Sequence, residues 1–349
     1  VPTPVTQVYA RQARLTLQAL FRAQTLLPSP PMDATLSAVA GADVFLFFIE
    51  SYGAITYDRP DFAARLQPAR DALARAIQES GRDVASAFVE SPTFGGSSWF
   101  AHISLMSGLQ INNPDLNALL MTQQRDTIVT TFARRGYRTL ALMPGLWYPW
   151  PEGAFYGFQD SYNGPRLAYP GPSFGWWDMP DQFTLARLDE QEVSQSARAP
   201  LFVFFPTVST HTPFTPLPPY QPDWGRMLTS TPFDADDLVA SYESEPDWFD
   251  LRPAYVNSVA YALETFAGYV QRRAGRDYVM ILIGDHQPPA VVTGQGAPWD
   301  VPVHVITNRP AVIDALVARG MTRGLAPTRP RLSHMHELLP VLLAAFSAS

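Results

Sequence analysis

The sequence of 349 residues contains no cysteine and no lysine, so all 25 of its basic side chains are arginines. The missing cysteine excludes disulfides, thiolate metal ligands and a cysteine nucleophile. The missing lysine excludes a Schiff base on the protein. The formal net charge of -7 leaves no basic footprint for DNA or RNA, so we expect no nucleic-acid partner.

Long hydrophobic runs are missing as well. The longest candidates, Val44 to Ile49 and Leu338 to Phe346, are far shorter than the ~20 apolar residues that span a bilayer. The chain starts at Val1 without an initiator methionine, and Val8 to Leu27 has helical spacing. We expect a helical lead-in over residues 1–40 and a main domain over residues 41–349. The lead-in either follows a removed membrane anchor or is a surface helix packed on the main domain.

Apolar runs alternate with helical patterns along the chain, and 46% hydrophobic residues suffice for a large core. Strands are predicted at Asp43 to Ile49, Asp83 to Val89, Arg138 to Met143, Leu201 to Phe205, Tyr278 to Ile283 and Val301 to Ile306. Helices are predicted at Phe62 to Gln78, Ser98 to Ser107, Thr122 to Arg135, Pro253 to Ala274 and His334 to Ala345. This alternation predicts an α/β fold with a largely parallel central sheet and helices on both faces.

Two stretches interrupt the alternation. Pro144 to Pro180 is dense in proline, glycine and aromatic residues, and Pro213 to Pro253 is rich in proline and aspartate. Long loops inside a compact domain are usually functional, and the aromatic content argues against disorder. We expect these loops to lie over the carboxyl edge of the sheet and wall a pocket, with Trp147 and Trp177 as candidate substrate contacts.

An Asp-His pair, Asp285 and His286, follows the apolar run Tyr278 to Ile283 after a single glycine, Gly284. The carboxyl ends of strands in open α/β sheets carry the ligands of these folds. A carboxylate oxygen and an imidazole nitrogen can bind a divalent metal, but two ligands are too few. The remaining ligands must come from other strand ends.

Two other segments can supply them. Glu50 follows the apolar strand Asp43 to Ile49, so its carboxylate reaches the same edge. Gly95 and Gly96 precede Ser98, the first residue of a predicted helix, whose amides and dipole favour an anion there. A serine hydroxyl beside a metal and a helix N-terminus can serve as a nucleophile without a histidine base, although serine is equally typical as a plain N-cap.

The order of these motifs resembles the alkaline phosphatase superfamily. It comprises a strand ending in Glu50, a glycine-rich turn before Ser98, a helix closing with Ser107-Gly108, the segment Thr210 to Phe214, and the strand before Asp285-His286. Within that superfamily, the chain most resembles the sulfatase-like phosphotransferases, which include lipoteichoic acid synthases and phosphoglycerol or phosphoethanolamine transferases. The resemblance covers Asp43 to Leu343 and marks residues 41–349 as a sulfatase-like catalytic domain.

The resemblance implies roles for individual residues. Counting back nine positions from Ser107 selects Ser98 as nucleophile, with Ser97 as the alternative. Glu50, Ser98, Asp285 and His286 would surround one divalent metal ion, Mn²⁺ or Zn²⁺, with Mg²⁺ as a further alternative. His211 would contact the transferred phosphate or protonate a leaving group. Further candidate pocket or substrate contacts are His102, His334 and His336. His304 lies inside the predicted strand Val301 to Ile306, where packing in the core is the main interpretation and a substrate contact is the alternative.

The chain also departs from its relatives. Classical sulfatases convert the Cys or Ser of a C/S-x-P-x-R motif to formylglycine, whereas Phe100 and His102 stand where that motif needs Pro and Arg. Sulfatase activity is therefore disfavoured. Two-metal phosphatases carry an Asp four residues before the equivalent of His211, where this chain has Thr207, so we expect one metal and not two.

From this resemblance we expect transfer of a phosphoglycerol or phosphoethanolamine group from a phospholipid or other phosphodiester donor to a glycan, polysaccharide or other hydroxyl, through a phosphoserine at Ser98. The expected location is the periplasmic or extracytoplasmic face of a bacterial inner membrane. Two alternatives stay open. One is a phosphodiesterase or phosphonate monoester hydrolase of the same superfamily, and the other is a degenerate member that only binds glycan.

Overall fold

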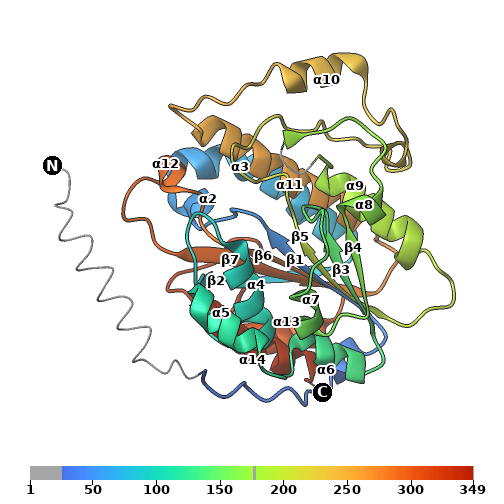
Figure 1. The fold of residues 1–349 in the computed structure, drawn as a ribbon, viewed down its shortest axis with the longest axis vertical. Helices are drawn as coiled ribbons and strands as arrows, with labels where there is room; N and C mark the ends of the chain where they lie inside the picture. Colours follow the sequence, from blue (N-terminus) through green and yellow to red (C-terminus); the bar gives the residue numbers. More distant parts are fainter. Residues whose placement is uncertain (1–25, 176–177, 349) are drawn as a thin grey trace.

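The structure, a computed structural model, describes residues 26–175 and 178–348 (Figure 1). Of the lead-in expected over residues 1–40, residues 1–25 lie outside the described part, and the rest contains the single turn η1, Ser37–Val39. Trp177 also lies outside the described residues. None of the helices in the described part combines the length and hydropathy needed to cross a membrane.

Within the described residues, nine strands form one sheet in the order β4-β3-β5-β1-β6-β7-β2-β8, with β9 paired to β2. The strands are β1 Asp43–Ile49, β2 Asp83–Glu90, β3 Arg138–Met143, β4 Asp160–Asn163, β5 Leu201–Pro206, β6 Tyr278–Gly284, β7 Asp300–Thr307, β8 Thr322–Arg323 and β9 Ser333–His334. The six strands expected from the sequence are confirmed within a residue at each end.

The sheet is mixed and mostly parallel. Strands β1, β3, β4, β5 and β6 run parallel to one another, whereas β7 is antiparallel to both β6 and β2. The carboxyl ends of β1, β2, β5 and β6 therefore lie at one edge of the sheet, and β7 runs the other way between two of them. The expected α/β architecture is confirmed.

Both faces of the sheet are buried, which explains the uninterrupted apolar runs. Strand β1 is buried along its whole length. Phe45 and Phe47 belong to one hydrophobic cluster, and Val44, Leu46 and Phe48 belong to the other, as the alternation of side chains in a strand requires.

Helices cover each face (Figure 1). The first cluster includes residues of α2 Ile55–Asp58, α3 Pro60–Glu79, α8 Gly164–Leu167, α9 Asp181–Leu188, the π-helical turn η3 Asp189–Val193, η4 Arg226–Leu228, α11 Arg252–Arg272 and α12 Ala290–Thr293, and α10 Ala235–Tyr242 packs against it. The second includes residues of η1, α4 Ser98–Ser107, α5 Pro114–Met121, α6 Ile128–Arg134, α7 Gly153–Tyr156, α13 Pro310–Val317 and α14 Met335–Phe346. The long helices α3 and α11 pack on each other.

The helix expected over Thr122 to Arg135 is wrong in its first turns. The structure has a separate helix α5 that ends at Met121, and α6 begins only at Ile128. Thr127 fixes that start, because its side chain accepts a hydrogen bond from the Thr130 amide while the Thr130 side chain accepts one from the Thr127 amide. This capping box marks Thr127 as the residue where α6 starts, so the residues just before it form a loop.

The two irregular stretches contain more structure than expected. Residues 144–180 include α7, β4 and α8, and residues 213–253 include η4 and α10. Strand β4 has only four residues and polar side chains at three of them, so it gives no apolar signal in the sequence.

Candidate active site

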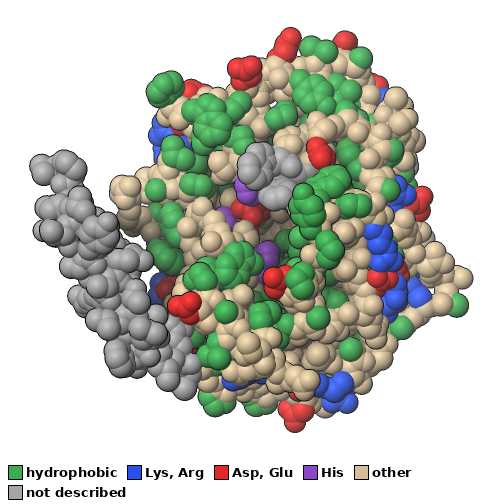
Figure 2. All heavy atoms as spheres, viewed as in Figure 1, with side chains coloured by type: hydrophobic (Ala, Val, Ile, Leu, Met, Phe, Trp, Pro, Cys, Tyr) green, Lys and Arg blue, Asp and Glu red, His purple; other side chains and the backbone are tan. Residues whose placement is uncertain are grey.

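The site lies where three segments meet at the carboxyl edge of the sheet. Glu50 follows β1, Asp285 and His286 follow the adjacent strand β6, and Ser98 opens α4 after β2. The turn before α4 is tied to the segment after β6, since the Gly95 amide donates to the Gln287 carbonyl oxygen at 3.1 Å. Figure 2 shows histidine and acidic side chains together in a hollow of this face.

Glycine at position 284 permits the close approach of β6 and β1. A Cβ atom there would clash with the Tyr52 carbonyl oxygen. The last residue of β6 must therefore be glycine for Asp285 to reach the end of β1, which explains the Gly that precedes the Asp-His pair.

The structure brings four predicted residues together. The Ser98 hydroxyl donates to Glu50 Oε2 at 2.8 Å and lies 3.2 Å from His286 Nε2. His286 Nε2 lies 3.4 Å from Glu50 Oε1 and 3.8 Å from Asp285 Oδ2. One ligand atom each from Glu50, Asp285 and His286 lies within 4.8 Å of the others.

A hydrogen bond at Nδ1, the ring nitrogen that points away from the acid cluster, fixes the orientation of His286. Its Nδ1 lies 2.8 Å from the Gln287 carbonyl oxygen, which can only accept, so Nδ1 carries the proton. Nε2 is then directed at Glu50, Asp285 and Ser98, where it can bind a metal ion when it carries no proton. A backbone carbonyl on the far ring nitrogen is the usual support of a metal-binding histidine.

The two carboxylates are also held by backbone contacts. Asp285 Oδ1 accepts hydrogen bonds from the amides of Ser51 at 2.8 Å and His286 at 2.6 Å. Glu50 is held through its main chain, since its amide donates to Thr207 Oγ1 and its carbonyl accepts from Thr210 Oγ1. Sequence reasoning missed Ser51 and Thr210, whose roles depend on β6 and β5 lying on either side of β1.

The electrostatics of the cluster formed by Glu50, Asp285 and His286 favour a bound cation. Burial, together with the nearby Glu50 carboxylate, raises the pKa of Asp285 well above its ordinary value. Burial also acts to raise the pKa of Glu50, but His286, the Asp285 hydrogen bond, His211 and Ser98 outweigh it and lower that pKa to about 2. One carboxyl group therefore keeps a proton while the other stays ionised, as expected for two acids crowded without a countercharge.

The donor set suits a divalent metal ion. Two carboxylates, an imidazole nitrogen and a hydroxyl group converge on one point. Zinc and manganese accept this mixture of oxygen and nitrogen donors, and a cation there would relieve the carboxylate repulsion. Among the described residues, Glu50, Asp285 and His286 form the candidate metal cluster.

The turn before α4 adopts an unusual backbone that places Ser98. Gly95, Gly96 and Ser97 all have positive φ, and Ser97 does so at 60° although it is not glycine. Ser97 is the N-cap, but its side chain makes no capping hydrogen bond. The contacts of Ser98 with Glu50 and His286 favour it over Ser97 as the reacting hydroxyl. Strained backbone of this kind is typical of functional turns.

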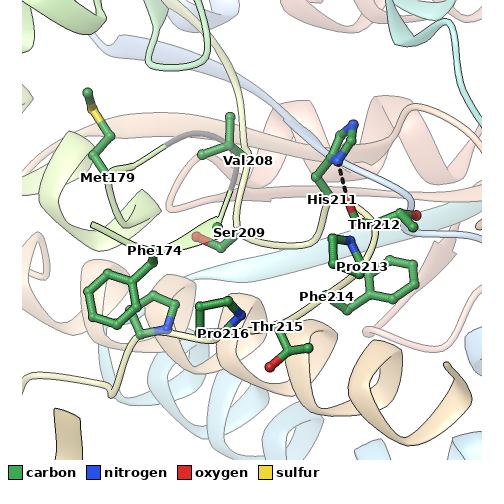
Figure 3. A pocket seen from close by; sticks show the side chains of 12 residues that line it. Phe174, Met179, Val208, Ser209, His211, Thr212, Pro213, Phe214, Thr215 and Pro216 are labelled. Atoms are coloured by element: carbon green, nitrogen blue, oxygen red, sulfur yellow. Dashed lines mark hydrogen bonds between the residues drawn. The ribbon is translucent and has the colours of Figure 1, made fainter. Parts of the chain in front are cut away.

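His211 lies beside this site on the loop after β5. Its Nδ1 lies 2.7 Å from the Thr212 carbonyl oxygen, so this nitrogen carries a proton. Figure 3 shows the far edge of the ring pointing away from Pro213 and Phe214. His211 also lines a small cavity of about 30 Å³ with Ser209 and Phe174. Its influence on the pKa of Glu50 places it near the acid cluster.

Asp181, at the start of α9, holds the loop that carries His211. Its side chain accepts hydrogen bonds from the amides of Val208 at 2.8 Å and Ser209 at 3.0 Å. Burial raises the pKa of Asp181 to about 6, although these hydrogen bonds act to lower it. Nothing in the local sequence marks Asp181, because its partners lie 27 and 28 residues away.

Asp181 predicts a pH dependence of stability. The pKa of Asp181 is raised from 3.8 to about 6 in the folded protein. The protonated carboxyl group therefore stabilises the folded state below pH 4, and this contribution is lost as the pH rises through 6. Asp181→Asn mimics the protonated group and lacks the effect. The free energy of unfolding of the wild type, relative to the variant, should fall by roughly 2–3 kcal/mol from pH 4 to pH 7 in urea titrations. A constant difference would contradict this assignment, and exposed Asp126→Asn serves as control.

The other predicted pocket and substrate contacts lie in three different places. His102 lies one turn along α4 from Ser98 and is buried. Trp147 is 43% exposed at the surface, whereas Trp150 of the same segment lines a cavity beside α4. His334 contacts Glu90 at the end of β2 at 3.5 Å and stacks on His336.

The structure places His304 apart from the acid cluster, inside the core. It lies in β7, where Ser86 Oγ is 2.7 Å from Nδ1 and the Tyr52 hydroxyl is 3.2 Å from Nε2. Burial lowers its pKa to about 3, so the ring is neutral. His304 stands in the middle of β7, Asp300–Thr307, and so lies away from the carboxyl edge of the sheet where the acid cluster is.

The family described as Sulfatase matches residues 104–313, which is more than half of the chain. A comparison with curated proteins finds no match. Ser98 and Glu50 precede the matched range, so their assignment rests on the geometry above and not on the match.

Solved structures with low sequence identity share the fold. The lipoteichoic acid synthase LtaP from Listeria monocytogenes is 12% identical, with 96% of this chain and 78% of that chain covered and a TM-score of 0.57. The phosphoglycerol transferase GacH from Streptococcus pyogenes, solved with sn-glycerol-1-phosphate, is 12% identical, with 90% and 77% covered and a TM-score of 0.52. The C-terminal periplasmic domain of EptC from Escherichia coli, solved with Zn, is 14% identical, with 90% and 84% covered and a TM-score of 0.53.

These likenesses confirm the expected alkaline phosphatase-like α/β fold. Together with the extent of the family match, they show that the chain belongs to the sulfatase family of the alkaline phosphatase superfamily.

Proposed function

We propose that this protein is a metal-dependent phosphotransferase that carries a phospho-head group on Ser98. The observation that supports the proposal most strongly is the contact of the Ser98 hydroxyl with both Glu50 and His286, beside Asp285. In this proposal Glu50, Ser98, Asp285 and His286 hold one Mn²⁺ or Zn²⁺. When bound, such an ion would supply positive charge to the phosphoryl oxygens and favour the ionised form of the serine.

The residues of the chain account for each proton. Ser98 Oγ attacks phosphorus, its proton passes to Glu50, and the bond from phosphorus to the lipid alcohol breaks. Protonated His211 gives a proton to the departing alcohol. In the second half, a hydroxyl of the acceptor attacks the phosphoserine and loses its proton to His211, while Ser98 recovers its own from Glu50.

The donor we propose is a phospholipid that carries phosphoglycerol or phosphoethanolamine, and the acceptor is a glycan hydroxyl. The structural likeness to a lipoteichoic acid synthase, LtaP, and to a phosphoglycerol transferase, GacH, which was solved with sn-glycerol-1-phosphate, supports this choice. We place the reaction at the extracytoplasmic face of a bacterial inner membrane, as the periplasmic origin of the EptC domain suggests. The residues after Ser98 lack the Pro and Arg of the formylglycine motif, which argues against sulfate esters.

Hydrolysis is the second candidate, because a water molecule could replace the acceptor alcohol at Ser98. The test incubates the Mn²⁺- or Zn²⁺-loaded protein with phosphatidylglycerol or phosphatidylethanolamine, with and without a glucosyl disaccharide. The proposal predicts release of diacylglycerol and a disaccharide heavier by the head group. Turnover of bis(p-nitrophenyl) phosphate alone would favour hydrolysis, and turnover of p-nitrophenyl sulfate alone would contradict both.

A further inference from the structure

A cavity of about 340 Å³ opens beside the nucleophile, between α4, α5 and the segment after β3. We call it the α4 cavity. The residues that define it here are Trp99, His102, Trp150, Glu152, Tyr156 and Phe204. Trp99 is adjacent to Ser98, and His102 lies four residues along the same helix, so the cavity begins within one helical turn of the reacting hydroxyl.

Aromatic rings form much of its wall. The Trp150 and Tyr156 ring centroids are 5.3 Å apart, and the His102 ring packs against Phe204 at 5.3 Å. Tyr156 is only 5% exposed, so this part of the wall is shielded from water. Indole and phenol faces attract organic cations, and more strongly where water is excluded.

The charge of the cavity is negative. Glu152 is the charged group among the described residues that line it, and no arginine does so. Glu152 lies close enough to Tyr156 to help burial raise the pKa of that phenol. Burial lowers the pKa of His102 to about 3, so this ring adds no positive charge at neutral pH.

His102 also has unused hydrogen-bonding capacity. It is 8% exposed, and its Nε2 has no partner among the described residues. A buried polar atom without a partner is uncommon and requires an explanation. A neutral imidazole nitrogen can accept a hydrogen bond from an ammonium group. The cavity has aromatic walls and already contains one carboxylate, so it would bind another negatively charged group poorly.

We propose that the α4 cavity binds the ammonium end of an aminoalcohol phosphodiester, so that Ser98 carries a phosphoethanolamine- or phosphocholine-like group in preference to phosphoglycerol. This inference rests on the proposed function and narrows its substrate class. The phosphoryl group lies at Ser98, the short carbon spacer runs along the first turn of α4, and the cation lies between the aromatic rings and Glu152.

The test compares two chromogenic esters of the same shape. p-Nitrophenyl phosphocholine carries a quaternary ammonium, and p-nitrophenyl 3,3-dimethylbutyl phosphate replaces that nitrogen by carbon. The metal-loaded wild type should show a kcat/KM at least about tenfold higher for the choline ester. In Glu152→Gln the ratio of the two values should fall toward one. The matched control is Asp115→Asn, an exposed acid on α5 outside the cavity, which should keep the wild-type ratio.

Equal kcat/KM values for the two esters in the wild type, or an unchanged ratio in Glu152→Gln, would overturn the inference while leaving the proposed function intact. Failure to turn over either ester and bis(p-nitrophenyl) phosphate would instead count against the proposed function. Binding is then decisive: in calorimetry, Ser98→Ala should bind phosphocholine at least about tenfold more tightly than 3,3-dimethylbutyl phosphate. Equal affinities, or no binding of either, would overturn the inference.

Discussion

Ser98→Ala is expected to reduce phosphodiester turnover by at least about 10⁴-fold, because loss of a covalent nucleophile removes the bond-forming atom itself. The wild type, quenched during turnover, should show an intact mass increased by the transferred phospho-group, and peptide mapping should place it on Ser98. The variant should show no adduct. Its fold should persist, since Ser98 is partly exposed and its side chain interacts with the acid cluster of Glu50, Asp285 and His286 and not with the hydrophobic core.

Ser97→Ala is the matched control for this experiment. Alanine and serine carry the same Cβ atom, so the positive φ of 60° at position 97 costs both residues about the same. This variant should retain the adduct and most of the turnover. An adduct that disappears in Ser97→Ala and persists in Ser98→Ala would assign the nucleophile to the other serine and contradict the geometry.

Asp285→Asn is expected to have opposite effects in metal-free and metal-loaded protein. Burial and the Glu50 carboxylate raise the pKa of Asp285, so the folded, metal-free protein favours the protonated form of this side chain. The stability that the protonated form contributes is lost as the pH rises. A neutral amide of the same shape removes this penalty and still accepts from the Ser51 and His286 amides through its oxygen. After treatment with a chelator at pH 8, the variant should therefore melt at the same or a higher temperature than the wild type.

The order should reverse when metal is added. A ligand that binds only the folded state stabilises it by about 2.7 kcal/mol at 100 times Kd, so Zn²⁺ or Mn²⁺ should raise the Tm of the wild type by several degrees. Asp285→Asn lacks one anionic ligand and should show little change. Asp277→Asn, just before β6 in an exposed pair with Arg309, should keep the metal response. An equal Tm increase in Asp285→Asn would remove Asp285 from the metal site.

The sequence predicted most of this site because three of its four groups follow buried strands. Glu50 and Asp285 are each the first residue after a buried strand, and parallel neighbours place such positions at one edge. Ser98 was found through the glycine turn and the family resemblance. The helix it opens has the predicted bounds, from Ser98 to Ser107.

The missed features depend on contacts between distant segments. The antiparallel direction of β7 leaves no mark in a strand that is buried along its whole length. Asp181 is recognised only by the amides it holds on another loop. Trp150 and Glu152 lie in a stretch where composition indicates a pocket wall, but composition cannot say which aromatic side chain turns inward.

The central claim is that Glu50, Ser98, Asp285 and His286 share one cation. The most direct test is a crystal structure of the protein grown with Zn²⁺, with anomalous data collected at the zinc edge. The account predicts a single strong peak about 2.0–2.2 Å from oxygen atoms of Glu50 and Asp285 and from His286 Nε2, with the Ser98 oxygen or its phosphate completing the coordination. Zinc bound at another group of residues, with this cluster empty at saturating zinc, would contradict it.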